Sequence, residues 1–296
     1  MVQQTLGDIF KNYAAAGTGV FADKDVLSHS YVPDIVYHRE DQTRQLAAIL
    51  SPMLRNQNTS NCFLYGKTGT GKTMITMHVA RELELAGKNI KILYINCKLR
   101  GVTDTEYRLL AELSRMLGSP VPPTGLPTDE VYNIFLQALG RIGKNTILIL
   151  DEIDSLVAKI GDDILYNLTR MNQNLTAAKP TIVGISNSLS FIDTIDPRVK
   201  SSLSEEEIIF PPYNSKQLAD ILEARSKMAF SPGALEPGVI QKCAAFAAQE
   251  HGDARKALDL LRIAAELAER EGAGKVSISH VDAAENKLDS DKTPRY

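Results

Sequence analysis

A glycine-rich stretch in the first third of the chain carries the residue types that bind phosphate. Its glycines let the backbone wrap closely, so that successive N–H groups and the start of the next helix face an anion. Lys72 would neutralise the outer phosphates of a nucleoside triphosphate, and the Thr73 hydroxyl would ligate magnesium. An apolar run, Cys62–Tyr65, precedes the stretch, and a helical pattern follows it. The sequence therefore predicts a phosphate-binding loop made of Gly66, Lys67, Thr68, Gly69, Thr70, Gly71, Lys72 and Thr73.

Two adjacent carboxylates, Asp151 and Glu152, follow a second apolar run in the middle of the chain. Ligands of open α/β sheets bind at the carboxyl edge of the strands, which is where this pair is expected. Asp151 would hold magnesium directly or through water, and Glu152 would orient and polarise an attacking water. A strand followed by two acids is common by itself. Together with the upstream loop, however, the pair predicts hydrolysis of a nucleoside triphosphate.

Two single residues are weaker candidates for the same site. Asn187 follows an apolar run over residues 181–186, where a neutral amide would position the hydrolytic water; on its own, such an asparagine is more often a turn residue. Arg255 falls in the first turn of a helical pattern that begins after Asp253. A cation there opposes the helix dipole unless it faces an anion such as a phosphate. A solvent-exposed arginine explains Arg255 equally well.

Bulk properties are those of a globular protein without a strong electrostatic field. The net charge of −3 gives no global attraction for nucleic acid or for an acidic membrane. The three cysteines, Cys62, Cys97 and Cys243, form no CxxC pair, and we interpret them as reduced thiols outside any zinc site. The start of the chain lacks the pattern of a secretory signal, and the apolar runs are strand-sized. We therefore expect a cytoplasmic, nucleoid-associated protein.

Strand-like and helix-like segments alternate up to residue 211. Strands are expected at 61–65, 90–96, 146–150 and 181–186, and helices at 73–86, 105–117 and 129–142. Nearly continuous apolar strands favour a parallel sheet covered on both faces by helices, which is an α/β fold. After Pro211, Pro212 and Tyr213 only helical patterns follow. The expected organisation is an N-terminal extension (1–30), an α/β domain (31–211), a small all-helical domain (212–290) and a tail (291–296).

These elements, in this order, resemble the AAA+ superfamily over most of the chain. By this resemblance residues 66–73 are the Walker A motif, Asp151 and Glu152 are Walker B, Asn187 is sensor 1 and Arg255 is sensor 2. The resemblance implies an ATPase whose ligands are ATP or ADP and Mg2+, with the helical domain as its lid.

A narrower resemblance is to the archaeal origin-recognition initiators. It rests on segments at residues 31–33, 38–40, 196–203, 210–213, 217–218 and 252–258. It implies that Val32, Pro33 and Arg39 lie near the adenine, and that Tyr213 belongs to the nucleotide site. It also implies a DNA-contacting helical insertion within residues 96–117, with these cations: Lys98, Arg100, Arg108 and Arg115. A solvated helix face remains the alternative for each cation.

The resemblance further implies an initiator of DNA replication. ATP would set the DNA-binding state, and slow hydrolysis would switch it off. Arg198 would act in trans on the nucleotide of a neighbouring subunit. The expected partners are duplex DNA, other initiator subunits and the replicative helicase. These initiators usually carry a C-terminal winged helix, whereas this sequence stops at Tyr296, so we expect weak DNA binding. A nucleotide-gated scaffold and a clamp-loader subunit are the alternative functions.

Overall fold

The structure is a computed structural model that describes residues 19–28, 31, 33, 35–175, 178–203 and 205–292. The chain divides into two compact units at Arg39 and at Pro212. We call residues 39–211 the α/β unit, and residues up to 38 together with those from 212 onward the helical unit. Among the described residues, no helix is both long and apolar enough to cross a membrane.

The α/β unit is built on a five-stranded sheet in which every neighbouring pair is parallel. The strand order is β2-β3-β4-β1-β5. The strands are β1 (Cys62–Tyr65), β2 (Ile90–Asn96), β3 (Asn145–Asp151), β4 (Lys179–Ser186) and β5 (Glu206–Ile209). All residues of β3 are buried, as expected for a central strand covered on both faces. The predicted parallel α/β fold is confirmed.

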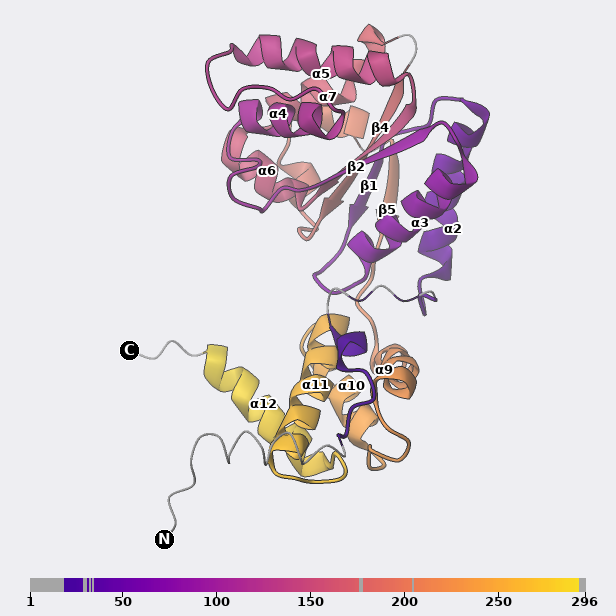
Figure 1. The fold of residues 1–296 in the computed structure, drawn as a ribbon, viewed down its shortest axis with the longest axis vertical. Helices are drawn as coiled ribbons and strands as arrows, with labels where there is room; N and C mark the ends of the chain where they lie inside the picture. Colours follow the sequence, from indigo (N-terminus) through magenta and orange to yellow (C-terminus); the bar gives the residue numbers. More distant parts are fainter. Residues whose placement is uncertain are drawn as a thin grey trace. The chain divides into compact units, whose positions relative to one another are not determined.

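Helices cover both faces of this sheet. Figure 1 shows α2 and α3 on one face and α4 to α7 on the other. The α-helices of the unit are α2 (Glu40–Leu50), α3 (Lys72–Ala86), α4 (Glu106–Met116), α5 (Thr128–Ile142), α6 (Ile153–Ile160), α7 (Asp163–Thr169) and α8 (Pro197–Leu203). Short 3-10 turns lie at Ser51–Arg55, Met171–Asn174 and Phe191–Asp193. The amphipathic face of α4 enters the core through Leu109, Leu110 and Leu113, opposite Phe135 and Leu139 of α5.

The fifth strand, β5, was not predicted. It is only four residues long and lies at the edge of the sheet, where Glu206, Glu207 and Ile209 are exposed. A short edge strand with charged residues has neither the length nor the apolar pattern of the central strands.

The described part of the helical unit contains a 3-10 turn (Lys24–Leu27) and four helices, α9 (Ser215–Ala229), α10 (Val239–Gln249), α11 (Ala254–Arg270) and α12 (Ile278–Lys292). A capping box closes the start of α9, because Asn214 and Gln217 each accept the other's backbone N–H. Asp253 caps α11 by accepting the Arg255 N–H over 2.8 Å.

The α/β domain was expected to begin at residue 31, whereas the described residues between 19 and 38 group with the helical unit. The reason is burial, because Val26 and Leu27 lie in the core of that unit. In addition, Arg225 of α9 donates a hydrogen bond to the Val26 carbonyl over 3.0 Å.

Candidate functional site

The glycine-rich loop connects β1 to α3 and is stabilised by its own side chains. Lys72 is buried, and its Nζ donates to the carbonyls of Gly66 and Lys67, each over 2.8 Å. Thr70 Oγ1 donates to the same Lys67 carbonyl over 2.8 Å. The loop therefore holds a closed shape around the lysine ammonium, at the positive end of α3.

Two glycines of the loop are required by its geometry. Gly71, the N-cap of α3, has φ +93°, a left-handed conformation that glycine adopts without strain. At Gly66 a Cβ atom would lie 2.3 Å from the Phe210 carbonyl oxygen, so any side chain would displace the backbone. Thr68 and Lys67 are exposed on the outer part of the loop.

Asp151 ends β3 and is surrounded by hydrogen-bond donors. Its Oδ2 accepts the hydroxyls of Thr73 and Tyr94, each over 2.9 Å, and its Oδ1 accepts the Glu152 N–H over 3.0 Å. Burial first, and then the charge of Asp151, raise the pKa of Tyr94, so the phenol stays a donor. Tyr94 was not predicted from the sequence, and its signal was an aromatic hydroxyl within the run Ile92–Ile95 of β2.

The Thr73 and Asp151 oxygens fit magnesium. They are hard donors on adjacent elements, and Mg2+ in nucleotide sites takes one or two protein oxygens, with phosphate and water completing its shell. No group of three or more His, Cys, Asp or Glu side chains suited to a metal occurs in the described part of the chain.

Glu152 follows Asp151 in a left-handed conformation, with φ +54°, and occupies the N-cap position of α6. Its Oε2 lies 3.4 Å from Nζ of Lys98, whose side chain is 72% exposed. The carboxylate of Glu152, which we expected to act on water, therefore has the solvent-exposed Lys98 as its neighbour.

Asn187 follows β4, the strand between β1 and β3. It therefore comes at the edge where the loop and Asp151 also lie. The turn is fixed by Ser186, whose Oγ donates to Asp154 Oδ1 over 2.9 Å and accepts the Ser188 N–H over 3.0 Å. The α/β unit thus brings Lys72, Asp151 and Asn187 to one edge of the sheet.

Comparisons with known proteins identify the family. Residues 55–189 match an AAA domain, and residues 219–286 match a Cdc6 AAA+ ATPase-type lid domain. The chain is 54% identical to ORC1-type DNA replication protein 1 of Archaeoglobus fulgidus over 288 residues, which cover 96% of this chain and 69% of that protein. The ORC1-type DNA replication protein of Pyrococcus furiosus is 50% identical, with 98% of this chain and 70% of the relative covered.

A solved structure agrees with these relatives. The Aeropyrum pernix ORC1 protein in complex with DNA superposes with a TM-score of 0.84 at 46% identity, covering 92% of this chain and 70% of that one. The chain belongs to the ORC1-type DNA replication proteins. It is therefore an ORC1/Cdc6-type AAA+ protein of DNA replication initiation, as the sequence motifs predicted.

Of the four residues that the family resemblance placed near the adenine or in the nucleotide site, the structure describes Pro33, Arg39 and Tyr213. Val32 lies outside the described residues, and Pro33 is half-buried in the helical unit. Arg39 is buried in the α/β unit, where it donates to the backbone carbonyls of Thr70 and Pro211. Tyr213 is buried in the helical unit and donates its N–H to the Gly252 carbonyl over 3.2 Å.

Arg198, the candidate for action in trans in this ORC1-type protein, is held within its own unit. Its Nε and one terminal nitrogen donate to the two Asp196 oxygens over 3.1 and 3.0 Å. Its guanidinium also lies 5.1 Å from the centre of the Tyr166 ring. These contacts orient a side chain that is 68% exposed.

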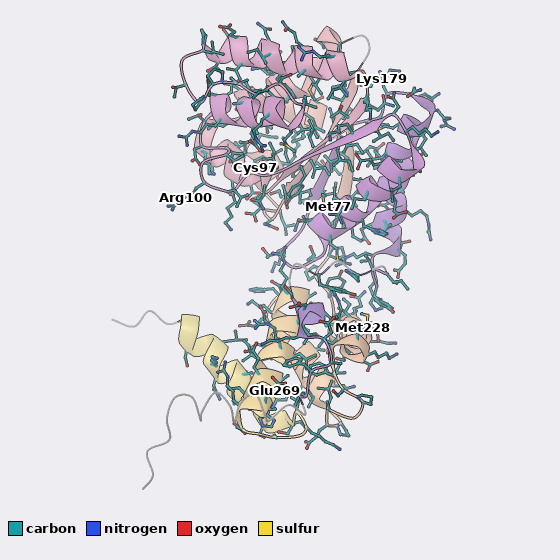
Figure 2. All side chains as sticks on the ribbon, viewed as in Figure 1. Met77, Cys97, Arg100, Lys179, Met228 and Glu269 are labelled. Carbon is teal, nitrogen blue, oxygen red and sulfur yellow. The ribbon has the colours of Figure 1, made fainter. Side chains whose placement is uncertain are left out.

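The four cations assigned to DNA contact differ in their pairing. Arg108 forms an ion pair with Asp104, and Arg115 with Glu112, both on α4 or next to it. Lys98 and Arg100 lie on the loop after β2, and Figure 2 shows Arg100 at the edge of the α/β unit. Lys159 fixes this loop by donating to the Cys97 carbonyl and to Asp104.

Proposed function

We propose that this ORC1-type protein binds ATP with Mg2+ at residues 66–73 and hydrolyses it slowly. The observation that carries the proposal is the hydrogen bond between Thr73 and Asp151, which joins the phosphate-binding loop to the end of β3. Lys72 would bind the β- and γ-phosphates, while the loop amides and the start of α3 hold the rest of the phosphate chain. Thr73 and Asp151 would hold the magnesium ion, directly or through water. Bound magnesium supplies charge neutralisation at the phosphates.

Hydrolysis is assigned to Glu152 and Asn187. Glu152 would polarise the attacking water, and the Asn187 amide would orient it at the end of β4. The ammonium of Lys98, 3.4 Å from Glu152 Oε2, would compete with the attacking water for that carboxylate, which supports slow turnover.

We assign two arginines to nucleotide sensing. Arg255, in the first turn of α11, would contact the γ-phosphate and so favour ATP over ADP. Arg198 would reach the nucleotide of a neighbouring initiator subunit, which requires it to leave Asp196.

We propose that duplex DNA is the partner of the α/β unit, through Arg100 first. The relative from Aeropyrum pernix is in complex with DNA, and this chain is 46% identical to it. Lys98, Arg108 and Arg115 contribute less, since each already forms an ion pair with a carboxylate. The nucleotide would switch this binding, and the replicative helicase would be recruited by the ATP-bound state.

The test combines nucleotide and DNA binding. A fluorescent ATP analogue should bind the wild type and should not bind Lys72→Ala, whereas Lys88→Ala, an exposed lysine of the same unit, should match the wild type. Fluorescence anisotropy should then show different affinities for labelled duplex DNA with ATP and with ADP. Equal ATP affinity in wild type and Lys72→Ala would refute the assigned site. Equal DNA affinity with both nucleotides would refute the switch.

A further inference from the structure

Arg39 is a cation buried inside the α/β unit. Its side chain is 2% exposed, and it is the largest of the fully buried side chains among the described residues. Removing a guanidinium from water is costly unless hydrogen bonds compensate it. Nε donates to the Thr70 carbonyl over 2.9 Å, and one terminal nitrogen donates to the Pro211 carbonyl over 2.5 Å. The guanidinium also lies 5.8 Å from the centre of the Phe210 ring.

The bond to Thr70 fixes a peptide group of the phosphate-binding loop. The peptide that joins Thr70 to Gly71 is trans, so its C=O and its N–H point in opposite directions. Because Arg39 holds the Thr70 carbonyl, the Gly71 N–H is directed away from Arg39. Gly71 is the N-cap of α3, where backbone N–H groups have no intrahelical acceptor and can receive an anion.

The bond to Pro211 connects the loop to a fixed segment. Phe210 donates its N–H to the Tyr65 carbonyl over 2.9 Å, which ties the end of β5 to the end of β1. The start of the loop is packed on the same segment, because there is no room for a Cβ between Gly66 and the Phe210 carbonyl. The segment 210–211 therefore supports the loop at Gly66 directly and at Thr70 through Arg39.

We propose that Arg39 is a positioning residue for phosphate recognition, which rests on the nucleotide site proposed above. It holds the Gly71 amide and the start of α3 in the orientation that receives a phosphate chain. The buried positive charge of Arg39, on the other side of the loop from the ligand, also attracts the phosphate electrostatically. The part of the ligand on which Arg39 acts is thus the polyphosphate and not the base.

A purely structural role is the competing explanation, and the helical unit offers a matched control. Arg225 is also buried and also donates to backbone carbonyls, those of Val26 over 3.0 Å and Tyr31 over 3.4 Å. Its guanidinium lies 4.4 Å from the centre of the Tyr31 ring. Arg225→Met therefore removes the same kind of contacts without touching the loop.

The experiment measures the affinity of two ligands in EDTA, so that metal is not involved. ADP and inorganic tripolyphosphate each compete against a fluorescent ADP analogue bound to the full chain. Arg39→Met should weaken the binding of both ligands by roughly ten- to a hundredfold, the scale of one charge-assisted hydrogen bond. Arg39→Lys keeps the positive charge but has only one donor group. It should therefore lower the affinity for both ligands by a smaller factor than Arg39→Met does. Arg225→Met should bind both as the wild type does, while its thermal midpoint falls.

Hydrogen exchange of the nucleotide-free protein gives a second readout that does not depend on ligand binding. The peptide over residues 66–73 should exchange faster in Arg39→Met and Arg39→Lys, and at the wild-type rate in Arg225→Met. Wild-type tripolyphosphate affinity in a folded Arg39→Met or Arg39→Lys variant would overturn the inference, as would unchanged exchange of the loop. If the wild type itself bound neither ligand, the proposed nucleotide site would fail, and the exchange data would still test Arg39.

Discussion

The hydroxyl of Thr73 donates a hydrogen bond to Asp151 Oδ2 over 2.9 Å. This contact joins the first turn of α3 to the end of β3, two elements that are far apart in the sequence. It places two oxygen groups where one magnesium ion can use both of them. The ion would then lie at the mouth of the phosphate-binding loop.

Thr73→Ala should raise the magnesium concentration needed for tight ATP binding. The variant loses a metal ligand and frees the Asp151 carboxylate, so we expect an increase of about tenfold or more. Titration of magnesium against a fluorescent ATP analogue measures the half-saturating concentration. Thr169→Ala, which loses a hydroxyl bonded to a helix carbonyl over 3.1 Å, is the control and should not change it. Identical magnesium curves for Thr73→Ala and wild type would remove Thr73 from the metal site.

Tyr94→Phe should also raise the magnesium concentration needed for tight ATP binding, but by less than Thr73→Ala does. The phenol is the second donor to Asp151 Oδ2, and its loss leaves the ring in place while the carboxylate gains rotational freedom. One ordinary hydrogen bond corresponds to roughly a two- to tenfold change in the half-saturating magnesium concentration. Binding of ADP in EDTA should be unaffected, because no metal is then held. A change of equal size in EDTA would mean that Tyr94 acts on the fold and not on the metal site.

Sequence reasoning predicted the parts of the candidate site that are contiguous in the chain. Residues 66–73 and the pair Asp151 and Glu152 each carry their pattern within a few positions, so the loop and the carboxylates were predictable. The sheet followed from its apolar central strands. Tyr94 was missed, because its contact with Asp151 depends on the register that pairs β2 with β3. The buried position of Arg39 depends on segments that meet only in the folded unit.

Stability should fall at alkaline pH because of the three buried thiols. Burial is the main cause that raises the pKa of Cys62, Cys97 and Cys243 from 9.0 to about 12. The thiols therefore stay neutral in the folded state. Their contribution to the free energy of unfolding is fully present below pH 9 and is lost between pH 9 and 12. Urea unfolding at a series of pH values should show a decreasing free energy of unfolding over this range.

A variant isolates the contribution of one thiol. Cys243→Ala removes one ionisable group, so its free energy of unfolding should depend less steeply on pH above 9 than that of the wild type. A thiol reagent at pH 8 should modify none of the three cysteines until the protein unfolds, since the thiolate is the reactive form. Rapid modification of the native protein would contradict the assigned burial.

Single-turnover hydrolysis by wild type and Glu152→Gln tests the central claim most directly. Glutamine keeps the shape of the side chain but removes the carboxylate that polarises water. Both proteins should bind radiolabelled ATP with similar affinity in the presence of magnesium. The wild type should convert the bound ATP slowly to ADP and phosphate, and the rate in Glu152→Gln should be lower by about a hundredfold or more. No ATP binding, or equal conversion rates in the two proteins, would contradict the account.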